Sequence, residues 1–458
     1  MKTIRIGSGA GYGGDRIEPA IDLIRRGELD YIIFECLAER TVSIAQKRRR
    51  ENPNLGYNDL FDYRFTRILD TFAELRAEGK ATPRVVTNMG AANPAAAAAR
   101  CRGMAAERDL SGLKIACVTG DDKTDELDQY LGYVTIETGA PLSDIDGEIL
   151  SANGYIGCSG IVRALEGGAD IVITGRVADP SLALGPLVHE FGWEMNDYER
   201  LGRGTWVGHL LECAGQVTGG YFADPGFKDV PELWNLGFPI IEVDEQGNGV
   251  VTKLPGTGGL VSEATVQEQS LYEIQDPKNY FTPDVIADFS QIHIEQDGTD
   301  RVRIHGAGGK APNGFYKTSI GYHDCYIGEG QISYGGQTAL PKAELARQII
   351  EKRFELIGLE AEETRFDYIG VNSLYGDAVS GSIRGEGAPA PTEVRLRVAA
   401  RTKTAEAARE VGREVEALYT NGPSSGGGAT ASVRDIVSIA SILIPSDHFH
   451  VDVKLLEA

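Results

Sequence analysis

The stretch IRIGSGAGYGGDR, residues 4–16, joins a short apolar strand to a glycine-rich loop, and an amphipathic pattern follows at residues 17–26. A strand that passes through a glycine loop into a helix is the opening of a βαβ unit. Backbone N–H groups and the helix dipole at such a helix start favour a bound anion. This stretch therefore predicts an α/β fold and a candidate ligand-binding loop.

The same alternation continues through the first half of the chain. Short apolar runs, each followed by polar residues and glycine, stand at residues 31–34, 84–87, 114–118 and 170–174. Strands that alternate with helices predict a parallel sheet with helices on its faces. We expect this sheet and its flanking helices to form one α/β domain over residues 1–245.

The pattern changes near residues 225–255, where Pro, Gly and Asp accumulate, and we place a domain boundary there. Residues 302–305 and 393–401 alternate in a way that suits an antiparallel or mixed sheet. Helices expected at 341–356 and 405–419 would cover that sheet. The second domain, residues 246–458, is therefore expected to be a mixed α/β domain.

The chain carries a formal net charge of -22, from 45 Lys and Arg against 67 Asp and Glu. Nucleic acids and anionic membranes bind basic surfaces, so we expect neither as a partner. The same field repels an anionic substrate at long range. A site for a carboxylate or a phosphate would therefore need its own donors or cations.

Other features bear on where the protein works. No stretch approaches the roughly 20 apolar residues of a membrane span, and the N-terminal residues lack the apolar core of a secretory signal. The six cysteines stand far apart without a CxxC pair, which indicates reduced thiols rather than a disulfide framework or a zinc knuckle. These features predict a cytoplasmic protein.

The first glycine loop is a weak match to the dinucleotide-binding fingerprint. Gly7 and Gly9 fit the pattern, but Tyr12 stands where the third glycine is needed. Asp15 and Arg16 at the end of the loop allow two interpretations. They form a helix cap with its counter-ion, or they supply a catalytic carboxylate and a substrate-binding guanidinium group.

Polar side chains also follow the other predicted strands, beginning with Glu35, a candidate catalytic carboxylate. The carboxyl ends of parallel strands meet at one edge of a sheet, where ligands bind. Carboxylates beside amides and guanidinium groups suit proton abstraction next to a carbonyl, with donors for the developing oxyanion. The candidate substrate-binding residues at this edge are Asn88, Asn93, Asn153, Arg176 and Asp179.

Residues 208–220 place His209, Glu212 and Cys213 on one helix face, at positions i, i+3 and i+4. Such a triple orients a general base, activates a thiolate, binds a metal, or is a hydrogen-bonded structural cluster. With seven histidines in the chain and no second ligand pair, we assign no metal. We expect Glu212 to orient or ionise His209, and the imidazolium to lower the pKa of the Cys213 thiol. Gln216 and Thr218, just beyond, are further candidate substrate-binding residues.

Later segments are less specific. The glycine loops at residues 255–259 and 421–428 lack the Gly-Lys-Ser/Thr ending of a P-loop, which argues against ATP hydrolysis. Each is either a binding loop for a carboxylate or coenzyme A phosphate, or a tight turn. Residues 322–334 are too polar for a plain buried strand and predict an active-site wall or an oligomer contact.

Five motifs, read as a set, resemble the acyclic terpene utilisation (AtuA) family, formerly a domain of unknown function. They are GAGYGGDR at 9–16, NMGAANP at 88–94, TGRVADPSLALGPL at 174–187, GHLLECAGQVTGGYF at 208–222 and YIGEGQISYGG at 326–336. The likeness covers most of the chain. The chain is similar to the short members of the family, which lack an extra C-terminal domain and accompany a small companion protein.

This resemblance implies catabolism of branched or acyclic acids and their coenzyme A thioesters. We expect a lyase of the hydratase/dehydratase type, with no cofactor required, acting on a mesaconate/methylmalate-like diacid or on a branched acyl-CoA. The alternative is a non-catalytic subunit that binds a metabolite or scaffolds the companion. A homo-oligomer associated with that companion is also expected.

Overall fold

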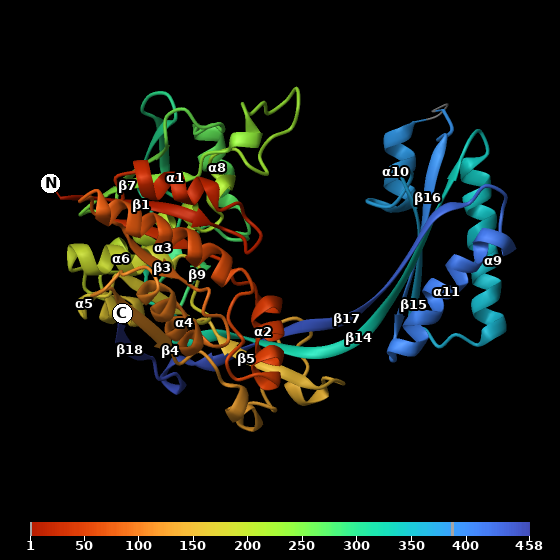
Figure 1. Cartoon of the computed structure of the whole chain (residues 1–458), viewed down its shortest axis with the longest axis horizontal. Coiled ribbons are helices and arrows are strands. Elements are labelled where there is room, and N and C mark those ends of the chain that lie inside the picture. The colour runs from red at the N-terminus through yellow and green to blue at the C-terminus, as the bar shows by residue number, and fades with distance from the viewer. Residues whose placement is uncertain (1, 386–388) are drawn as a thin grey trace. The chain divides into compact units, whose positions relative to one another are not determined.

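The computed structural model describes residues 2–385 and 389–458 and divides into two compact units. The first unit contains residues up to 145, residues 149–321 and residues 439–458, and the second contains residues 146–148 and 322–438 (Figure 1). Both units combine helices with sheets, which confirms the predicted α/β class. Among the described residues, no helix is long and apolar enough to cross a membrane.

The first unit is built on a ten-stranded sheet in the order β11-β12-β8-β7-β1-β2-β3-β6-β4-β18. The five central strands are all parallel to one another, as the alternation of strands and helices predicted. They are β1 (Thr3–Ala10), β2 (Tyr31–Phe34), β3 (Arg84–Thr87), β6 (Ile171–Thr174) and β4 (Lys114–Thr119).

Antiparallel strands extend this parallel core on both sides. On the β1 side lie β7 (Pro239–Asp244), β8 (Gly249–Lys253), β12 (Arg301–His305) and β11 (His293–Gln296). On the β4 side lies β18 (Asp452–Glu457), so the last residues of the chain join the same sheet. The sheet is therefore mixed, with its parallel part in the middle.

The expected domain boundary between residues 245 and 246 falls in the hairpin that joins β7 to β8. The carboxylate of Asp244 accepts hydrogen bonds from the backbone N–H groups of Gln246 and Asn248. Gly247 adopts a φ of 80° in this turn, a conformation that glycine takes without a side-chain clash. The glycine and aspartate that predicted a domain boundary here form a tight turn instead. Domain linkers and tight turns favour the same residue types, so composition alone does not separate them. The compact units divide at other points, near residues 145–149, 321 and 438.

Helices cover both faces of the parallel strands. In β2, Ile32 and Phe34 face a core that includes α1 (Glu18–Arg26), α3 (Phe61–Ala77) and α4 (Pro94–Ala106). Tyr31 and Ile33 face the opposite core, with α5 (Ser159–Glu166), α6 (Ser181–Phe191) and α7 (Tyr198–Glu212). This alternation follows from the period of two along a strand, and it explains why the whole strand is apolar.

A small three-stranded sheet and three further elements complete the first unit. A small sheet contains β9 (Tyr280–Phe281), β10 (Ile286–Asp288) and β13 (Gly308–Lys310), and α7 packs against β10 and β13. A Cβ atom on Gly202 would lie 1.9 Å from the carbonyl oxygen of Gly308, so this glycine permits the contact. The remaining elements are α2 (Glu39–Glu51), α8 (Glu263–Leu271) and β5 (Ile149–Gly154).

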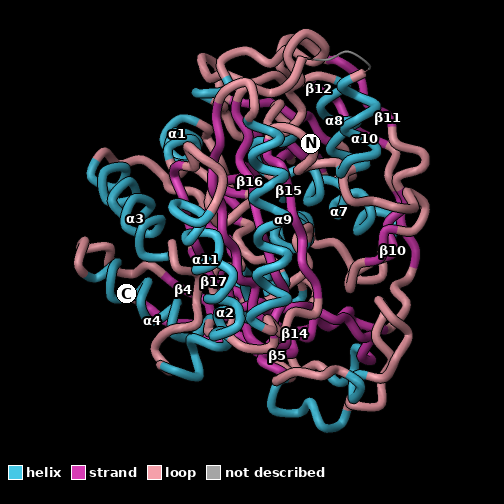
Figure 2. The backbone as a smooth tube through the Cα atoms, turned by 90° about the vertical axis from the view of Figure 1, so that its right-hand side faces the viewer, coloured by secondary structure: helices cyan, strands magenta, loops and turns pink. Residues whose placement is uncertain are grey.

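The second unit has a β-α-β-α-β-α-β order, with the strands arranged β15-β16-β14-β17 in the sheet. Its helices are α9 (Ala339–Ile357), α10 (Gly376–Arg384) and α11 (Ala405–Asn421), and its complete strands are β15 (Glu363–Ile369) and β16 (Glu393–Thr402). The strands β14 (Phe315–Gly335) and β17 (Gly427–Pro445) belong to it from residue 322 and up to residue 438, respectively. The helices α9 and α11 pack on one face of this sheet (Figures 1 and 2). Their positions confirm the helices expected at 341–356 and 405–419.

The polar segment 322–334 lies in β14, and its two faces have different neighbours. Gly328 faces α11, where an added Cβ atom would lie 2.1 Å from the carbonyl oxygen of Ala408. On the alternate positions, Glu329 accepts a hydrogen bond from Arg397, and Gln331 accepts one from Arg395. The polar residues of this strand therefore bond to charged residues of β16 within the second unit.

Candidate functional site

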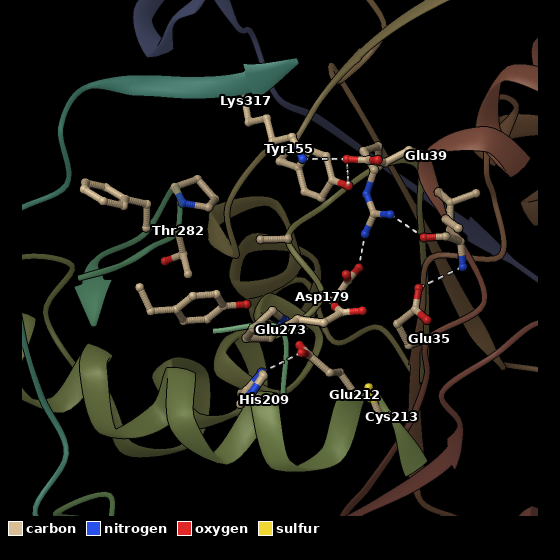
Figure 3. Close-up of a pocket in the computed structure, with 18 of the residues that line it drawn as sticks. Glu35, Glu39, Tyr155, Asp179, His209, Glu212, Cys213, Glu273, Thr282 and Lys317 are labelled. Atoms are coloured by element: carbon tan, nitrogen blue, oxygen red, sulfur yellow. Dashed lines mark hydrogen bonds and ion pairs between the residues drawn. The ribbon is translucent and has the colours of Figure 1, made fainter. Parts of the chain in front are cut away.

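A cavity of about 740 Å³ lies in the first unit, beyond the carboxyl ends of β1, β2 and β6 (Figure 3). The loops after these strands contribute Glu35 and Asp179, and the end of α7 contributes His209 and Glu212. The volume is typical of a small-molecule site. The structure thus places seven of the predicted site residues on one cavity at the expected edge of the sheet: these four, together with Arg176, Cys213 and Gln216.

Glu35 is held in place by the residues around it. One carboxylate oxygen accepts hydrogen bonds from the backbone N–H of Leu37 at 2.8 Å and from the side-chain amide of Asn88 at 2.9 Å. The buried Asn88 in turn accepts a hydrogen bond from the backbone N–H of Cys36. Burial, with Asp179 nearby, raises the pKa of Glu35 to about 8, although Arg176 acts in the opposite direction. Asn88 therefore positions the carboxyl group rather than lining the cavity.

Arg176 is fully buried and already engaged. Its guanidinium group donates to the carboxylate of Asp179 and to the backbone carbonyls of Leu37 and Val177. Its charge also lies 4.4 Å from the centre of the Tyr155 ring, a cation–π distance. Burial raises the pKa of Asp179 despite this partner. Arg176 is thus a fixed counter-charge that ties three loops together.

His209 and Glu212 form a buried pair on α7. His209 Nδ1 and Glu212 Oε1 are 2.7 Å apart, as the i, i+3 spacing predicted. Burial raises the pKa of Glu212 to about 7, the imidazole opposes this rise, and Asp179 and Glu273 add to it. Within the described residues, His209 Nε2 and Glu212 Oε2 have no hydrogen-bond partner. A buried carboxyl group with one unpartnered oxygen on a cavity wall is a candidate proton-transfer group.

Cys213 lines the same cavity, but the prediction of a lowered thiol pKa was wrong. Burial raises the pKa of this thiol, and the neighbouring carboxylate of Glu212 raises it further. Gly11 packs closely against Cys213, because a Cβ atom there would lie 2.4 Å from the Cα atom of Cys213. Cys213 is therefore a neutral thiol in a tightly packed wall.

Another carboxylate group of the cavity, that of Glu39, is not among the residues predicted from the sequence. Glu39, in the first turn of α2, accepts hydrogen bonds from Lys317 at 2.6 Å, Tyr155 at 3.1 Å and Ser319 at 3.3 Å. Burial alone would raise the pKa of Glu39, but these partners lower it below its ordinary value. Glu39 lies shortly after β2 in the sequence. The three side chains that bond to it, however, are 116, 278 and 280 positions away along the chain, so no local sequence pattern reveals them.

The segment that follows α8 supplies the remaining polar wall, with Glu273, Tyr280 and Thr282 (Figure 3). Glu273 has a φ of 61°, a backbone conformation that is uncommon outside glycine and is often found at functional sites. The ring of Tyr280 lies 5.4 Å from that of His209, and burial raises the pKa of its hydroxyl well above the ordinary value. Tyr280 is therefore a neutral O–H donor at neutral pH.

Asp15 and Arg16 lie outside this cavity. The carboxylate of Asp15 accepts hydrogen bonds from the backbone N–H groups of Gly11 at 2.8 Å and Tyr12 at 3.1 Å. Arg16 approaches the carbonyl oxygen of Trp234 at 3.4 Å. Both border a separate cavity of about 520 Å³. These contacts are structural, but they differ from the expected helix cap: Asp15 closes the glycine loop, whereas the N-cap residue of α1 is Ile17.

Three other predicted residues bond to the fold itself. Asn93 caps α4 and donates to the carbonyls of residues 53 and 55. The buried Asn153 donates to Asp121, and Thr218 donates to the carbonyl oxygens of residues 215 and 237. Gln216 does line the cavity. Strand-end loops thus contain both site residues and structural residues, which their types alone do not separate.

The charge of the cavity restricts its ligands. Two cationic side chains line it, and both are already bonded, Arg176 to Asp179 and Lys317 to Glu39. Within residues 2–385 and 389–458, no group of three or more His, Cys, Asp and Glu side chains is arranged to hold a metal ion. Among the described residues, five carboxyl groups line the cavity: Glu35, Glu39, Asp179, Glu212 and Glu273.

The fold and the site define an α/β protein with a carboxylate-lined cavity at the carboxyl edge of a parallel sheet. The chain belongs to the acyclic terpene utilisation family AtuA, whose family model matches residues 4–455. This match confirms the resemblance and includes residues of both units. No curated protein and no solved structure matches the chain. The family's name fits a catabolic role.

Proposed function

We propose that the protein is a hydratase/dehydratase-type lyase that acts on a thioester of a small branched or acyclic acid. The observation that carries this proposal is that Glu212 and Glu35, both on one cavity, have pKa values raised to about 7 and about 8. Elimination of water needs a base at the α-carbon and an acid at the β-hydroxyl. Two carboxyl groups that titrate near neutral pH supply both.

The residues divide the work according to their surroundings. Glu212 is the base: His209 Nδ1–H holds one oxygen, and the unpartnered oxygen accepts the α-proton. Glu35, with the higher pKa, donates its proton to the β-hydroxyl. The Cα–H and Cβ–O bonds break, the C=C bond forms, and water leaves. Tyr280, which stays protonated, donates to the developing thioester oxyanion.

The cavity charge favours a thioester over a free diacid. A dicarboxylate would bring two negative charges to a wall with five carboxyl groups and two cations that are already paired. Burying a charge without a partner is costly. The carbonyl of a thioester is uncharged and needs only hydrogen-bond donors.

The proposal is tested by following exchange of the α-proton in D₂O, together with hydration of 2-enoyl thioesters. Exchange should occur with the wild type and fall at least 100-fold in Glu212→Gln, since general base catalysis contributes about 10²- to 10⁴-fold. Glu199→Gln, on an exposed position of the same helix, is the matched control. Tight thioester binding without exchange or hydration would overturn the proposal and point to a metabolite-binding subunit.

The free acid and the thioester are compared in the same assay. Turnover of mesaconate or methylmalate that exceeds turnover of thioesters would contradict the substrate class proposed here. Assembly into a homo-oligomer, and association with a small companion, stay predictions that light scattering with and without a co-expressed partner tests.

A further inference from the structure

A third cavity, of about 430 Å³, adjoins the carboxylate-lined one. It lies among the first glycine loop, α2 and the segment before α3. We call it the chain cavity. Its walls include Ile44 and Ala45 of α2, together with Tyr57 and Leu60. Two charged residues on its wall, Arg48 and Asp59, form an ion pair with each other.

The two cavities share a boundary. Five residues line both of them: Gly11, Tyr12, Glu35, Leu37 and Ala38. Glu35, the acid proposed above, is thus on the wall of each. A molecule whose reacting carbon lies at Glu35 and Glu212 therefore has an apolar space next to its reactive end.

Part of the apolar wall of the chain cavity is exposed to solvent, although Leu37 and Ala45 are buried. Ile44 is 39% exposed and Leu60 is 37% exposed, and the Tyr12 side chain at the shared boundary is 71% exposed. Removing such side chains from water is favourable by about 25 cal/mol per Å² of apolar surface. An apolar ligand group that filled the cavity would gain this free energy without having to replace any polar partner.

We propose that the chain cavity holds the hydrocarbon chain of the substrate, while its thioester end lies at the carboxyl groups. This inference rests on the proposed function for the position of the reactive end. It deepens that function by placing the apolar part of the substrate: an extended hydrocarbon chain on the acyl group, whose length is selected by the walls at Ile44, Tyr57 and Leu60.

The inference accounts for the joint composition of the two cavities. The carboxylate-lined cavity excludes a second negative charge, and the chain cavity offers no free cation to one, because Arg48 pairs with Asp59. A substrate with a distal carboxylate would leave that charge unpartnered in either space. A substrate with a distal hydrocarbon chain matches both.

The test uses saturated acyl N-acetylcysteamine thioesters with chains of four to ten carbons. These ligands cannot be hydrated, so calorimetry or ligand-induced thermal shift reports binding alone. Affinity should rise about fourfold per added methylene until the cavity is full, because burial of each CH₂ contributes about 0.8 kcal/mol. An affinity in the wild type that does not depend on chain length would overturn the inference.

Two variants place the same bulky side chain on the same helix. Ile44→Trp fills the chain cavity and should remove the chain-length dependence, whereas Arg40→Trp, at an exposed position that lines neither cavity, should keep it. Leu60→Trp, on another segment of the wall, replaces Ile44→Trp if that variant does not fold by circular dichroism. Chain-length dependence that persists in a folded wall variant would contradict the inference.

Failure of the proposed function is recognised separately. Glu212→Gln retains the chain cavity, so it should show the same chain-length dependence of binding as the wild type even though its turnover is lost. Binding that depends on chain length in a protein with no lyase activity would support the chain cavity and reject the reaction. Lyase activity on short and long thioesters alike would support the reaction and reject the chain cavity.

Discussion

The cavity of the first unit and the sheet of the second unit both gather arginine, aspartate and glutamate, with different results. In the cavity, carboxyl groups outnumber the cations, and burial raises the pKa values of Glu35 and Glu212 to about 8 and about 7. On the sheet, Arg397 pairs with Glu329 at 2.6 Å, and Arg401 pairs with Asp324 at 2.6 Å.

The pKa values on the sheet shift in the opposite direction. Hydrogen bonds from Arg401 lower the pKa of Asp324; burial would raise the pKa of Glu329, but its bonds to Gln331 and Arg397 lower it overall. Matched pairs keep carboxylates ionised and hold strands together. Burial without a matching cation raises the pKa values of carboxyl groups to near neutral pH, where these groups exchange protons. The balance of charge and burial, rather than the residue types, therefore separates a site from a scaffold.

The largest expected effect is on turnover. Glu212→Gln should reduce turnover about 10²- to 10⁴-fold, because it removes the proposed base. Its thermal midpoint should stay near that of the wild type, because the amide replaces a carboxyl group that burial already disfavours when ionised. Glu329→Gln is the matched change in the second unit and should leave turnover within about twofold.

A parallel collapse of folding and turnover in Glu212→Gln would favour a structural role for this residue. His209→Asn adds a second readout, because loss of the imidazole should shift the pH profile of turnover as well as its maximum. An unchanged profile would remove His209 from the mechanism.

Stability should show the next largest contrast. Arg176→Met breaks a buried pair and leaves the Asp179 carboxylate and two backbone carbonyls without their donor, which should cost about 3–5 kcal/mol. Arg397→Met removes the ion pairs with Glu329 and Asp367 on the sheet. The cost should be about 1 kcal/mol, because Arg434 still pairs with Glu329 and Arg365 still pairs with Asp367. Urea unfolding of both variants measures the difference, and equal costs would contradict the distinction.

The pH dependence of stability should also separate the two regions. Glu212 and Glu35 have folded-state pKa values above the ordinary 4.5, so the folded protein favours their protonated forms. Their stabilisation is fully present below about pH 4.5 and is lost as the pH rises through about 7 and about 8.

The free energy of unfolding of the wild type should therefore contain a falling component between about pH 5 and 8, with a slope of at most about 1.4 kcal/mol per pH unit for each group. This component should become smaller in Glu212→Gln and in Glu35→Gln. Asp324 has a lowered pKa, so its contribution is lost only in acid, as the pH falls through the folded value. Identical pH profiles for the Glu212→Gln and Asp324→Asn variants would break the comparison.

The smallest effect concerns the thiol. Cys213→Ala should keep turnover within about threefold, because burial and Glu212 hold the pKa of this thiol high and leave no thiolate at neutral pH. Alkylation of Cys213 by iodoacetamide should be slow below pH 9. Rapid labelling coupled to loss of turnover would restore the nucleophilic role that the sequence suggested.

Local patterns in the sequence account for much of the fold. The apolar runs at β2, β3, β4 and β6 and the helices of the second unit were recognised from periodicity, because burial acts on each element separately. The domain boundary expected between residues 245 and 246 lies in the hairpin between β7 and β8. Its Gly247 and Asp244 serve a tight turn, and the pairing that closes it is made by residues on both sides of the turn.

The sequence by itself determined the family, the α/β class, the edge of the sheet where the cavity lies, and the pairing of His209 with Glu212, because these depend on motifs and on helical spacing. The tertiary structure decided which polar residues line the cavity and with what charge. Glu39 meets Lys317, and Glu273 meets Asp179 and Glu212, only after distant segments come together. Burial and partner charge are properties of that assembled surface, and they raised the pKa of Cys213 where the sequence had indicated the opposite.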